Sequence, residues 1–112
     1  MSNEIRLMNL MMDSLKDPFV FVDTDHVIRY MNKSAISRYE RWGGAELLGK
    51  SIFDCHNEHS CEAILEVLRE MQDGGEEKLV TDNAKHRAYM RAVRDESGQL
   101  IGYYERYEPP VE

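Results

Sequence analysis

The sequence predicts a small α+β domain, on the evidence of its length, its hydrophobic content and the order of its hydrophobic patterns. The chain has 112 residues, of which 42% are hydrophobic, and domains most often contain roughly 100–150 residues. The patterns run from one helix through two strands and three helical pieces to three further strands. Because strands lie at both ends with helices between them, we expect a five-stranded antiparallel sheet with the helices packed on one face.

An amphipathic helix is predicted at the N-terminus, over residues 3–15. Its main apolar stripe has helical spacing and consists of Ile5, Met8, Met11, Met12 and Leu15. Leu7 and Leu10 lie off this stripe, so the helix has a second apolar face, whereas a surface helix needs one. We therefore expect Leu7, Leu10 and Met11 to form a homodimer contact, which would also serve as the output surface.

Residues 19–22 and 27–31 are predicted to form a hairpin across the polar turn 23–26. Asn32 or Ser34 then caps a helix that runs to about Trp42, and residues 45–48 form one more helical turn. Residues 51–60 are expected to be mostly irregular, with Ser60 as the cap of a helix over 61–71.

Three strands are predicted to follow, over residues 78–81, 87–94 and 100–107, separated by turns at 82–85 and 95–98. We divide the chain into an N-terminal helix (1–16), a core domain (17–108) and a tail (109–112).

Composition and motifs exclude several classes of function. The net charge of −7 argues against a nucleic-acid surface, which needs clustered Lys and Arg. The sequence shows no secretory signal and no apolar run long enough to span a bilayer, so we expect a cytoplasmic protein without a membrane partner. It also lacks a Gly-rich phosphate loop, a G-x-S-x-G elbow and an H-E-x-x-H motif. We therefore expect binding, not catalysis.

Three segments resemble motifs of the PAS family, in the family's order and spacing. They are V-D-T-D-H-V-I-R-Y-M-N (22–32), E-L-L-G-K (46–50) followed by Phe53, and V-R-D-E-S-G (93–98) followed by Gly102. His26 stands where the family usually has Gly, and His tolerates positive φ better than most residues. The resemblance implies a sensory domain that binds a small ligand or cofactor between the sheet and the 61–71 helix. It also implies that the signal passes to a partner, such as a histidine kinase or a transcription regulator.

A narrower resemblance concerns D-C-H-N-E-H-S (54–60), which is similar to a segment of bacterial PAS domains linked to haem or metal sensing. In carbon-monoxide-sensing haem regulators of this family, the residue at the position of His56 is a haem ligand. The second iron ligand of those regulators falls near Lys78 or Leu79 here, and neither suits that role. The resemblance therefore offers, as an alternative, a haem-binding gas or redox sensor with His56 as the metal ligand. The predicted pocket residues are His56, Phe53, Ile64, Leu65, Leu68, Met90 and Tyr104.

Two of these assignments stay open at this point. Met90 shares a strand face with Ala88 and Ala92, and these small neighbours leave space for Met90 either to line a pocket or to act as a second haem ligand. Cys55, His56, His59 and Cys61 supply atoms that suit zinc, but their spacing does not match structural zinc sites. The roles of Cys55, His59 and Cys61 remain unassigned. A third interpretation of the chain as a whole is a dimerisation domain that binds no ligand.

Overall fold

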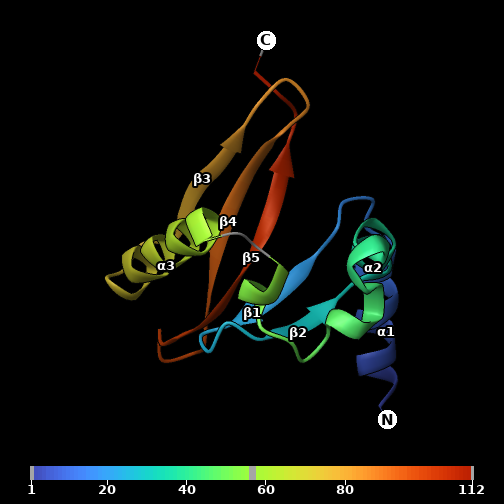
Figure 1. Cartoon of the computed structure of the whole chain (residues 1–112). Coiled ribbons are helices and arrows are strands. Elements are labelled where there is room, and N and C mark those ends of the chain that lie inside the picture. The colour runs from blue at the N-terminus through green and yellow to red at the C-terminus, as the bar shows by residue number, and fades with distance from the viewer. Residues whose placement is uncertain (1, 56–57, 112) are drawn as a thin grey trace.

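The computed structural model describes residues 2–55 and 58–111, and in these ranges it contains a five-stranded antiparallel sheet (Figure 1). The strand order is β2-β1-β5-β4-β3, so the N-terminal hairpin and the C-terminal meander share one sheet, as the sequence predicts. The predicted fold class is confirmed. The strands are β1 (Val20–Asp23), β2 (Ile28–Met31), β3 (Glu77–Asp82), β4 (Arg87–Arg94) and β5 (Leu100–Glu108).

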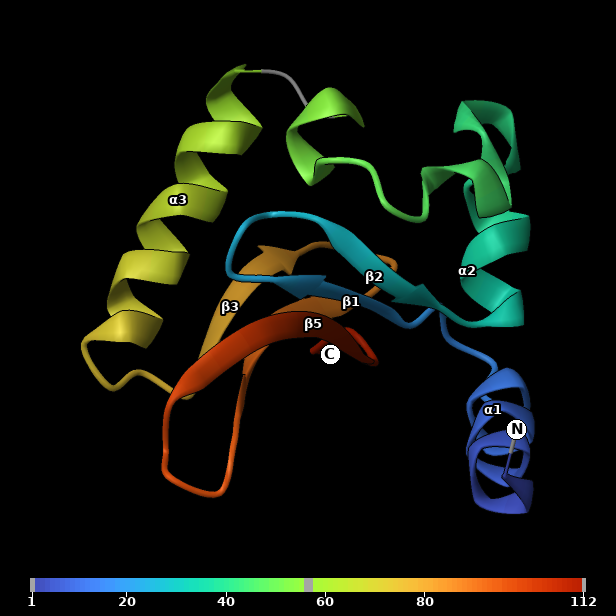
Figure 2. The ribbon, with the colours of Figure 1, turned by 90° about the horizontal axis from the view of Figure 1, so that it is seen from below.

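The helices between β2 and β3 cover one face of this sheet, which we call the helical face (Figure 2). The first helix, α1, lies instead to one side of the sheet, next to α2 (Figures 1 and 2). No helix in the described ranges is both long and apolar enough to cross a membrane. The helical elements are α1 (Asn3–Asp13), α2 (Lys33–Arg38), α3 (Glu58–Gln72) and the 3₁₀ turns η1 (Glu40–Trp42), η2 (Gly44–Leu47) and η3 (Ile52–Cys55).

Several helix boundaries differ from the sequence-based predictions, among them the end of the first helix, which lies at Asp13 and not at Leu15. The helix expected to run to Trp42 ends at Arg38 and continues as the separate turn η1, followed by Gly43 at a φ of 123°. Ser60 was predicted to cap the third helix, and this was wrong because α3 already begins at Glu58. A capping residue needs non-helical backbone, and Ser60 lies inside the helix.

The cap of α2 and the turn of the first hairpin follow the predictions. Asn32 caps α2, because its side-chain oxygen accepts a hydrogen bond from the Ala35 amide. His26 occupies the left-handed region at a φ of 67°, at the position where the family usually has Gly. Asp23 stabilises this turn by accepting hydrogen bonds from the amides of Asp25 and Val27.

The hydrophobic core lies between the helical face of the sheet and the helices that cover it. α3 contributes Val67, Leu68 and Met71, which are all at least 92% buried. The sheet contributes alternate residues, since successive side chains of a strand point to opposite faces. The remaining buried members of the core are Val22, Ile28, Met31, Ala35, Leu47, Met90, Ala92 and Tyr103.

Candidate functional site

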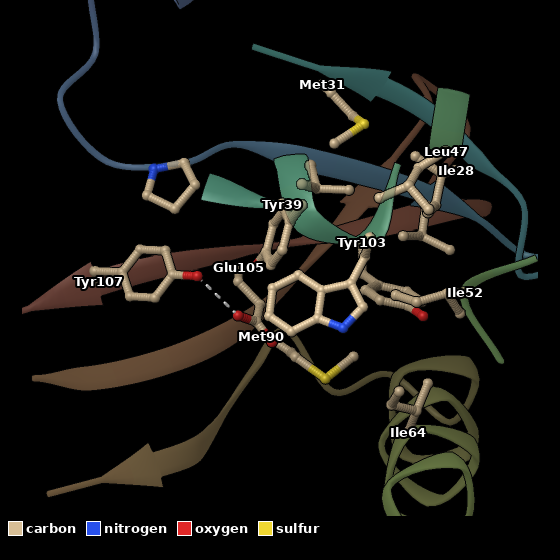
Figure 3. Close-up of a pocket in the computed structure, with 14 residues that line it drawn as sticks. Ile28, Met31, Tyr39, Leu47, Ile52, Ile64, Met90, Tyr103, Glu105 and Tyr107 are labelled. Atoms are coloured by element: carbon tan, nitrogen blue, oxygen red, sulfur yellow. Dashed lines mark hydrogen bonds between the residues drawn. The ribbon is translucent and has the colours of Figure 1, made fainter. Parts of the chain in front are cut away.

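A cavity of about 180 Å³ lies between the helical face of the sheet and the segment from α2 to η3 (Figure 3). Ile64 of α3 points into the cavity from a third side. Most of the lining is apolar, and the polar groups come from Glu105 and three tyrosines. The lining residues are Pro18, Val20, Val22, Ile28, Met31, Tyr39, Trp42, Leu47, Ile52, Ile64, Met90, Tyr103, Glu105 and Tyr107.

The alternation of β4 and β5 explains why the sheet contributes this set of side chains. On β4, Ala88, Met90 and Ala92 are buried on the helical face. On β5, Tyr103, Glu105 and Tyr107 share that face, and Glu105 pairs with Met90 across the two strands. Met90, Tyr103, Glu105 and Tyr107 line the cavity from this face, whereas Ala88 and Ala92 do not.

One part of the cavity wall is polar and carries a negative charge. The Tyr107 hydroxyl donates a hydrogen bond to Glu105 at 3.1 Å (Figure 3), and the Tyr39 hydroxyl interacts with that of Tyr107. Burial raises the pKa of Tyr39, Tyr103 and Tyr107, and the charge of Glu105 raises each of these pKa values further. The three tyrosines are therefore neutral hydroxyl groups at physiological pH.

The Tyr103 hydroxyl is buried and has no hydrogen-bond partner within the described part of the chain. The side chain is only 2% exposed and lines the cavity. A buried polar group without a partner costs about 1–3 kcal/mol, and most such groups in native proteins are paired. A ligand with a hydrogen-bond acceptor could supply the missing partner.

The predicted pocket residues are distributed over several places. Ile64 and Met90 line the cavity. Leu68 is buried in the core under α3 and Leu65 is half-buried on the same helix, but neither lines the cavity. The Phe53 ring packs 4.5 Å from the His26 ring, measured between ring centroids.

Tyr104 and His56 need separate comment. Tyr104 was predicted to contact a ligand, but it lies on the face of the sheet opposite the cavity, where its ring stacks on Phe19 with centroids 4.7 Å apart. The physical reason is alternation, since Tyr103 occupies the helical face and its neighbour must point away. His56, the predicted haem ligand, lies outside the described residues.

Sequence reasoning did not select several residues that line the cavity. Tyr39, Trp42, Glu105 and Tyr107 were absent from the predicted pocket, although residues two or four apart on a strand, such as Tyr103, Glu105 and Tyr107, share one face. The sequence pattern did not tell which face of β5 the helices cover. Tyr39 and Trp42 follow α2 in short turns whose orientation has no sequence period.

A haem does not fit the described cavity. Pockets for drug-sized ligands measure roughly 300–1,000 Å³, and a haem is larger than most such ligands, whereas this cavity measures about 180 Å³. Met90 lines the cavity among apolar side chains, which agrees with the first of its two predicted roles, that of a pocket-lining residue. Ligand binding in this cavity therefore does not require a haem.

The side chain of Asn32 connects the surroundings of the cavity to α1. Asn32 is fully buried and follows Met31, which lines the cavity. Its side-chain oxygen also accepts from the Phe19 amide, and its side-chain nitrogen donates to the carbonyls of Met12 and Asp17 at 2.9 and 3.2 Å. One side chain thus joins the end of α1, the linker to β1 and the start of α2.

α1 is joined to α2 by a second hydrogen bond, which the Asp13 carboxylate accepts from the Lys33 amide at 2.8 Å, but none of the residues of α1 is buried. The predicted dimer residues Leu7, Leu10 and Met11 expose 57%, 53% and 59% of their surface. Ile5 and Met8 are exposed to a similar degree. These side chains are therefore accessible to a partner within the described structure.

Comparison with solved structures shows the same fold in several bacterial proteins. A C-terminal domain from Streptococcus mutans has 21% identity and a TM-score of 0.77, over 94% of this chain and 84% of that one. A PAS domain from Colwellia psychrerythraea has 13% identity and a TM-score of 0.70, over 96% and 97% of the two chains. A sensory box sensor histidine kinase from Vibrio cholerae has 14% identity and a TM-score of 0.65, over 97% and 94%.

No curated protein matches the sequence at a significant level. The family model described as the PAS fold matches residues 12–110, which include every strand of the sheet. The predicted division into 1–16, 17–108 and 109–112 stays a prediction, and so does the narrower haem-linked subgroup. The match over most of its length shows that this chain belongs to the PAS family.

Proposed function

We propose that this chain is a sensory module that binds a small, mainly apolar ligand in its cavity and relays the bound state through α1. The observation that carries this proposal is the position of Asn32. It lies next to a cavity-lining residue, and it donates one hydrogen bond to Met12 at the end of α1 and one to Asp17 in the linker that follows. A ligand that shifts β2 by a small amount would change those bonds, and a ligand shifts an equilibrium when it binds one arrangement better than the other.

The size of the cavity supports a ligand of about one ring. An apolar cavity of about 150 Å³ is sufficient to bind benzene, and this cavity is slightly larger. Binding without chemical turnover is part of the proposal, because the cavity offers apolar contacts and orienting hydroxyl groups.

The binding step can be tested with toluene as the probe, by ligand-observed NMR. Ile64→Phe places a larger side chain into the cavity and should abolish binding. Leu65→Phe is the matched control, because Leu65 is the next residue of α3 and does not line the cavity. Equal loss in both variants, or toluene binding that survives Ile64→Phe, would contradict the assignment of the cavity as the ligand site.

The relay step predicts that toluene changes the amide hydrogen exchange of α1. The change should disappear in Asn32→Asp, which keeps the capping oxygen but replaces the amide nitrogen that donates to Met12 and Asp17. If α1 exchange is the same with and without toluene in the wild-type protein, the relay is wrong even where binding is intact.

We propose further that α1 pairs with α1 of a second copy, and that the dimer passes the signal to a histidine kinase or transcription-regulator module. An isologous contact needs a single self-complementary patch, and Leu7, Leu10 and Met11 are exposed and apolar. Leu10→Glu should convert the dimer to a monomer in sedimentation velocity, and Asn9→Glu, on the same helix, should leave it intact. A wild-type monomer at high concentration would remove this part of the proposal.

A haem-dependent version of the sensor is a weaker candidate, because the cavity is too small for the group. It predicts a Soret absorption band in the purified protein that His56→Ala abolishes. A colourless protein that binds toluene favours the small-ligand version. A colourless protein that does not bind toluene favours a ligand-free dimerisation domain.

A further inference from the structure

The Glu105 carboxylate lies in a mainly apolar cavity without a cationic partner among the residues that the structure describes. Its side chain is half-buried, and its hydrogen bond comes from the neutral hydroxyl of Tyr107. Carboxylates in apolar surroundings are normally paired with a positive charge. The cavity therefore contains a negative charge that the described residues leave uncompensated.

The arginines of the same two strands do not compensate this charge, because each pairs with another carboxylate. Arg87 pairs with Glu108, Arg94 with Glu76, and Arg91 and Arg106 with Glu77. Two further basic side chains lie near the polar wall: Arg38 interacts with the Tyr39 hydroxyl and is exposed, and the His86 ring lies 5.3 Å from the Tyr107 ring between centroids. Arg38 forms no ion pair with Glu105 in the described structure.

Aromatic rings line the same cavity as the carboxylate. Tyr39, Trp42 and Tyr107 all line it, and the rings of Tyr39 and Trp42 lie 6.2 Å apart between centroids at 57° to each other. Aromatic faces attract cations, and rings in an aromatic cage bind alkylammonium groups. The Trp42 ring already accepts a cation in this structure, since the Arg41 guanidinium lies 5.3 Å from its centroid.

We propose that the cavity binds a small organic cation, an amine that carries one ring or a short apolar chain. The ammonium group would lie between the Glu105 carboxylate and the rings of Tyr39 and Trp42, and the apolar part among Ile28, Leu47 and Met90. Tyr103 lies two residues before Glu105 on β5, so the Cα atoms of the two residues are roughly 7 Å apart along the strand. The Tyr103 hydroxyl would donate to an acceptor at the other end of the ligand. This inference rests on the proposed function, because it names the chemical class of the ligand for the same cavity.

The test compares three probes of similar size by isothermal titration calorimetry, with Trp42 fluorescence as a second readout. Trp42 is the one tryptophan of the chain. The probes are benzylamine, which is a cation at neutral pH, benzyl alcohol, which is neutral, and toluene. A charge-assisted contact predicts that the wild-type protein binds benzylamine about tenfold to a hundredfold more tightly than benzyl alcohol.

Glu105→Gln removes the charge and keeps the shape of the side chain, and it should abolish the preference for benzylamine over benzyl alcohol. Glu96→Gln is the matched control, because Glu96 is exposed in the turn between β4 and β5. It should keep the full preference. The wild-type comparison needs no variant, so it decides the question even if Glu105→Gln does not fold.

The outcomes separate this inference from the proposed function. If benzylamine and benzyl alcohol bind equally well, or if Glu105→Gln keeps the preference, the cation assignment is wrong and the cavity remains a ligand site. If no probe binds, toluene included, both the cation assignment and the proposed ligand site are wrong.

Discussion

α1 and α3 have the same kind of sequence pattern and very different positions in the structure. Both carry apolar residues at helical spacing, but α3 buries Val67, Leu68 and Met71 against the sheet, whereas α1 buries none of its residues. Polar side chains also join each helix to the rest of the domain. Asn32 binds the end of α1, and Arg94 donates to the carbonyls of Met71 and Gly75 at the end of α3. The comparison teaches that α3 belongs to the core, whereas α1 is attached mainly through hydrogen bonds.

The largest expected effect comes from removing a buried methionine of α3. Met71 is 2% exposed, so Met71→Ala should lower the free energy of unfolding by about 2–5 kcal/mol. Met11→Ala in α1 is the matched control, because Met11 is 59% exposed and its loss should cost less than about 0.5 kcal/mol. Urea unfolding at a concentration that keeps the protein monomeric measures both. Equal losses would show that α1 contributes to the core in solution.

Asn32→Ala should have the next largest effect. The change removes the cap of α2, worth about 1 kcal/mol, and leaves buried backbone groups such as the Phe19 amide without their partner, at about 1–3 kcal/mol. We expect a total loss of about 2–4 kcal/mol together with faster amide exchange in α1. Ser34→Ala is the control, because its hydroxyl donates one exposed hydrogen bond to Lys16. If Asn32→Ala leaves α1 exchange unchanged, Asn32 does not hold α1.

Arg94→Ala tests the corresponding attachment of α3. Its guanidinium donates to Met71, Gly75 and Gly98 and pairs with Glu76, and hydrogen bonds to a charged group contribute about 1.5–3 kcal/mol. We expect a loss in that range by urea unfolding. Arg91→Ala, on the same strand, removes a longer and more exposed ion pair at 3.8 Å and should cost about 0–1 kcal/mol. If Arg94→Ala and Arg91→Ala lower the free energy of unfolding equally, the hydrogen bonds from Arg94 to the end of α3 do not stabilise the domain.

The smallest effect is expected for Tyr103→Phe, which removes the unpartnered hydroxyl in the wall of the cavity. Stability near neutral pH should stay the same or rise by up to about 1 kcal/mol, and Tyr104→Phe on the opposite face should change little. Burial raises the pKa of Tyr103 above its ordinary value of 10.0, so the unfolded chain loses this proton first as the pH rises. Wild-type stability should therefore fall above about pH 10, and Tyr103→Phe should weaken that fall. Urea unfolding at pH 8 and above pH 10 measures both effects.

Much of the fold could be predicted because its strands carry a clear period of two between turn residues. β4 was predicted with its observed bounds, and the hairpin turn at His26 has the positive φ that its family position requires. Ser60 was wrongly predicted as the cap of α3, because the sequence pattern of a serine before an apolar stripe does not show whether the helix starts at the serine or two residues earlier. The stripe itself predicted α3 correctly.

The candidate site could be predicted only in part. Ile64 and Met90 follow from periodicity, since each lies on an apolar face that must be buried. Tertiary packing determines which face of β5 the helices cover, and the strand pattern does not reveal it. From the sequence alone, Glu105 is therefore indistinguishable from the other acidic residues of this acidic chain. Trp42 comes from a 3₁₀ turn, where no repeat indicates the direction of a side chain.

The strand order has a consequence for how the protein reaches its fold. β1 pairs with β5, so that Phe21 lies opposite Tyr104 in the middle of the sheet, although the two residues come from opposite ends of the chain. Loop closure over such a distance is entropically unfavourable, and long-range strand pairing slows folding. During synthesis, the first hairpin must wait until β5 has left the ribosome before the sheet can close around it. The N-terminal third of the chain is therefore the part that most needs protection from misfolding while the protein is being made.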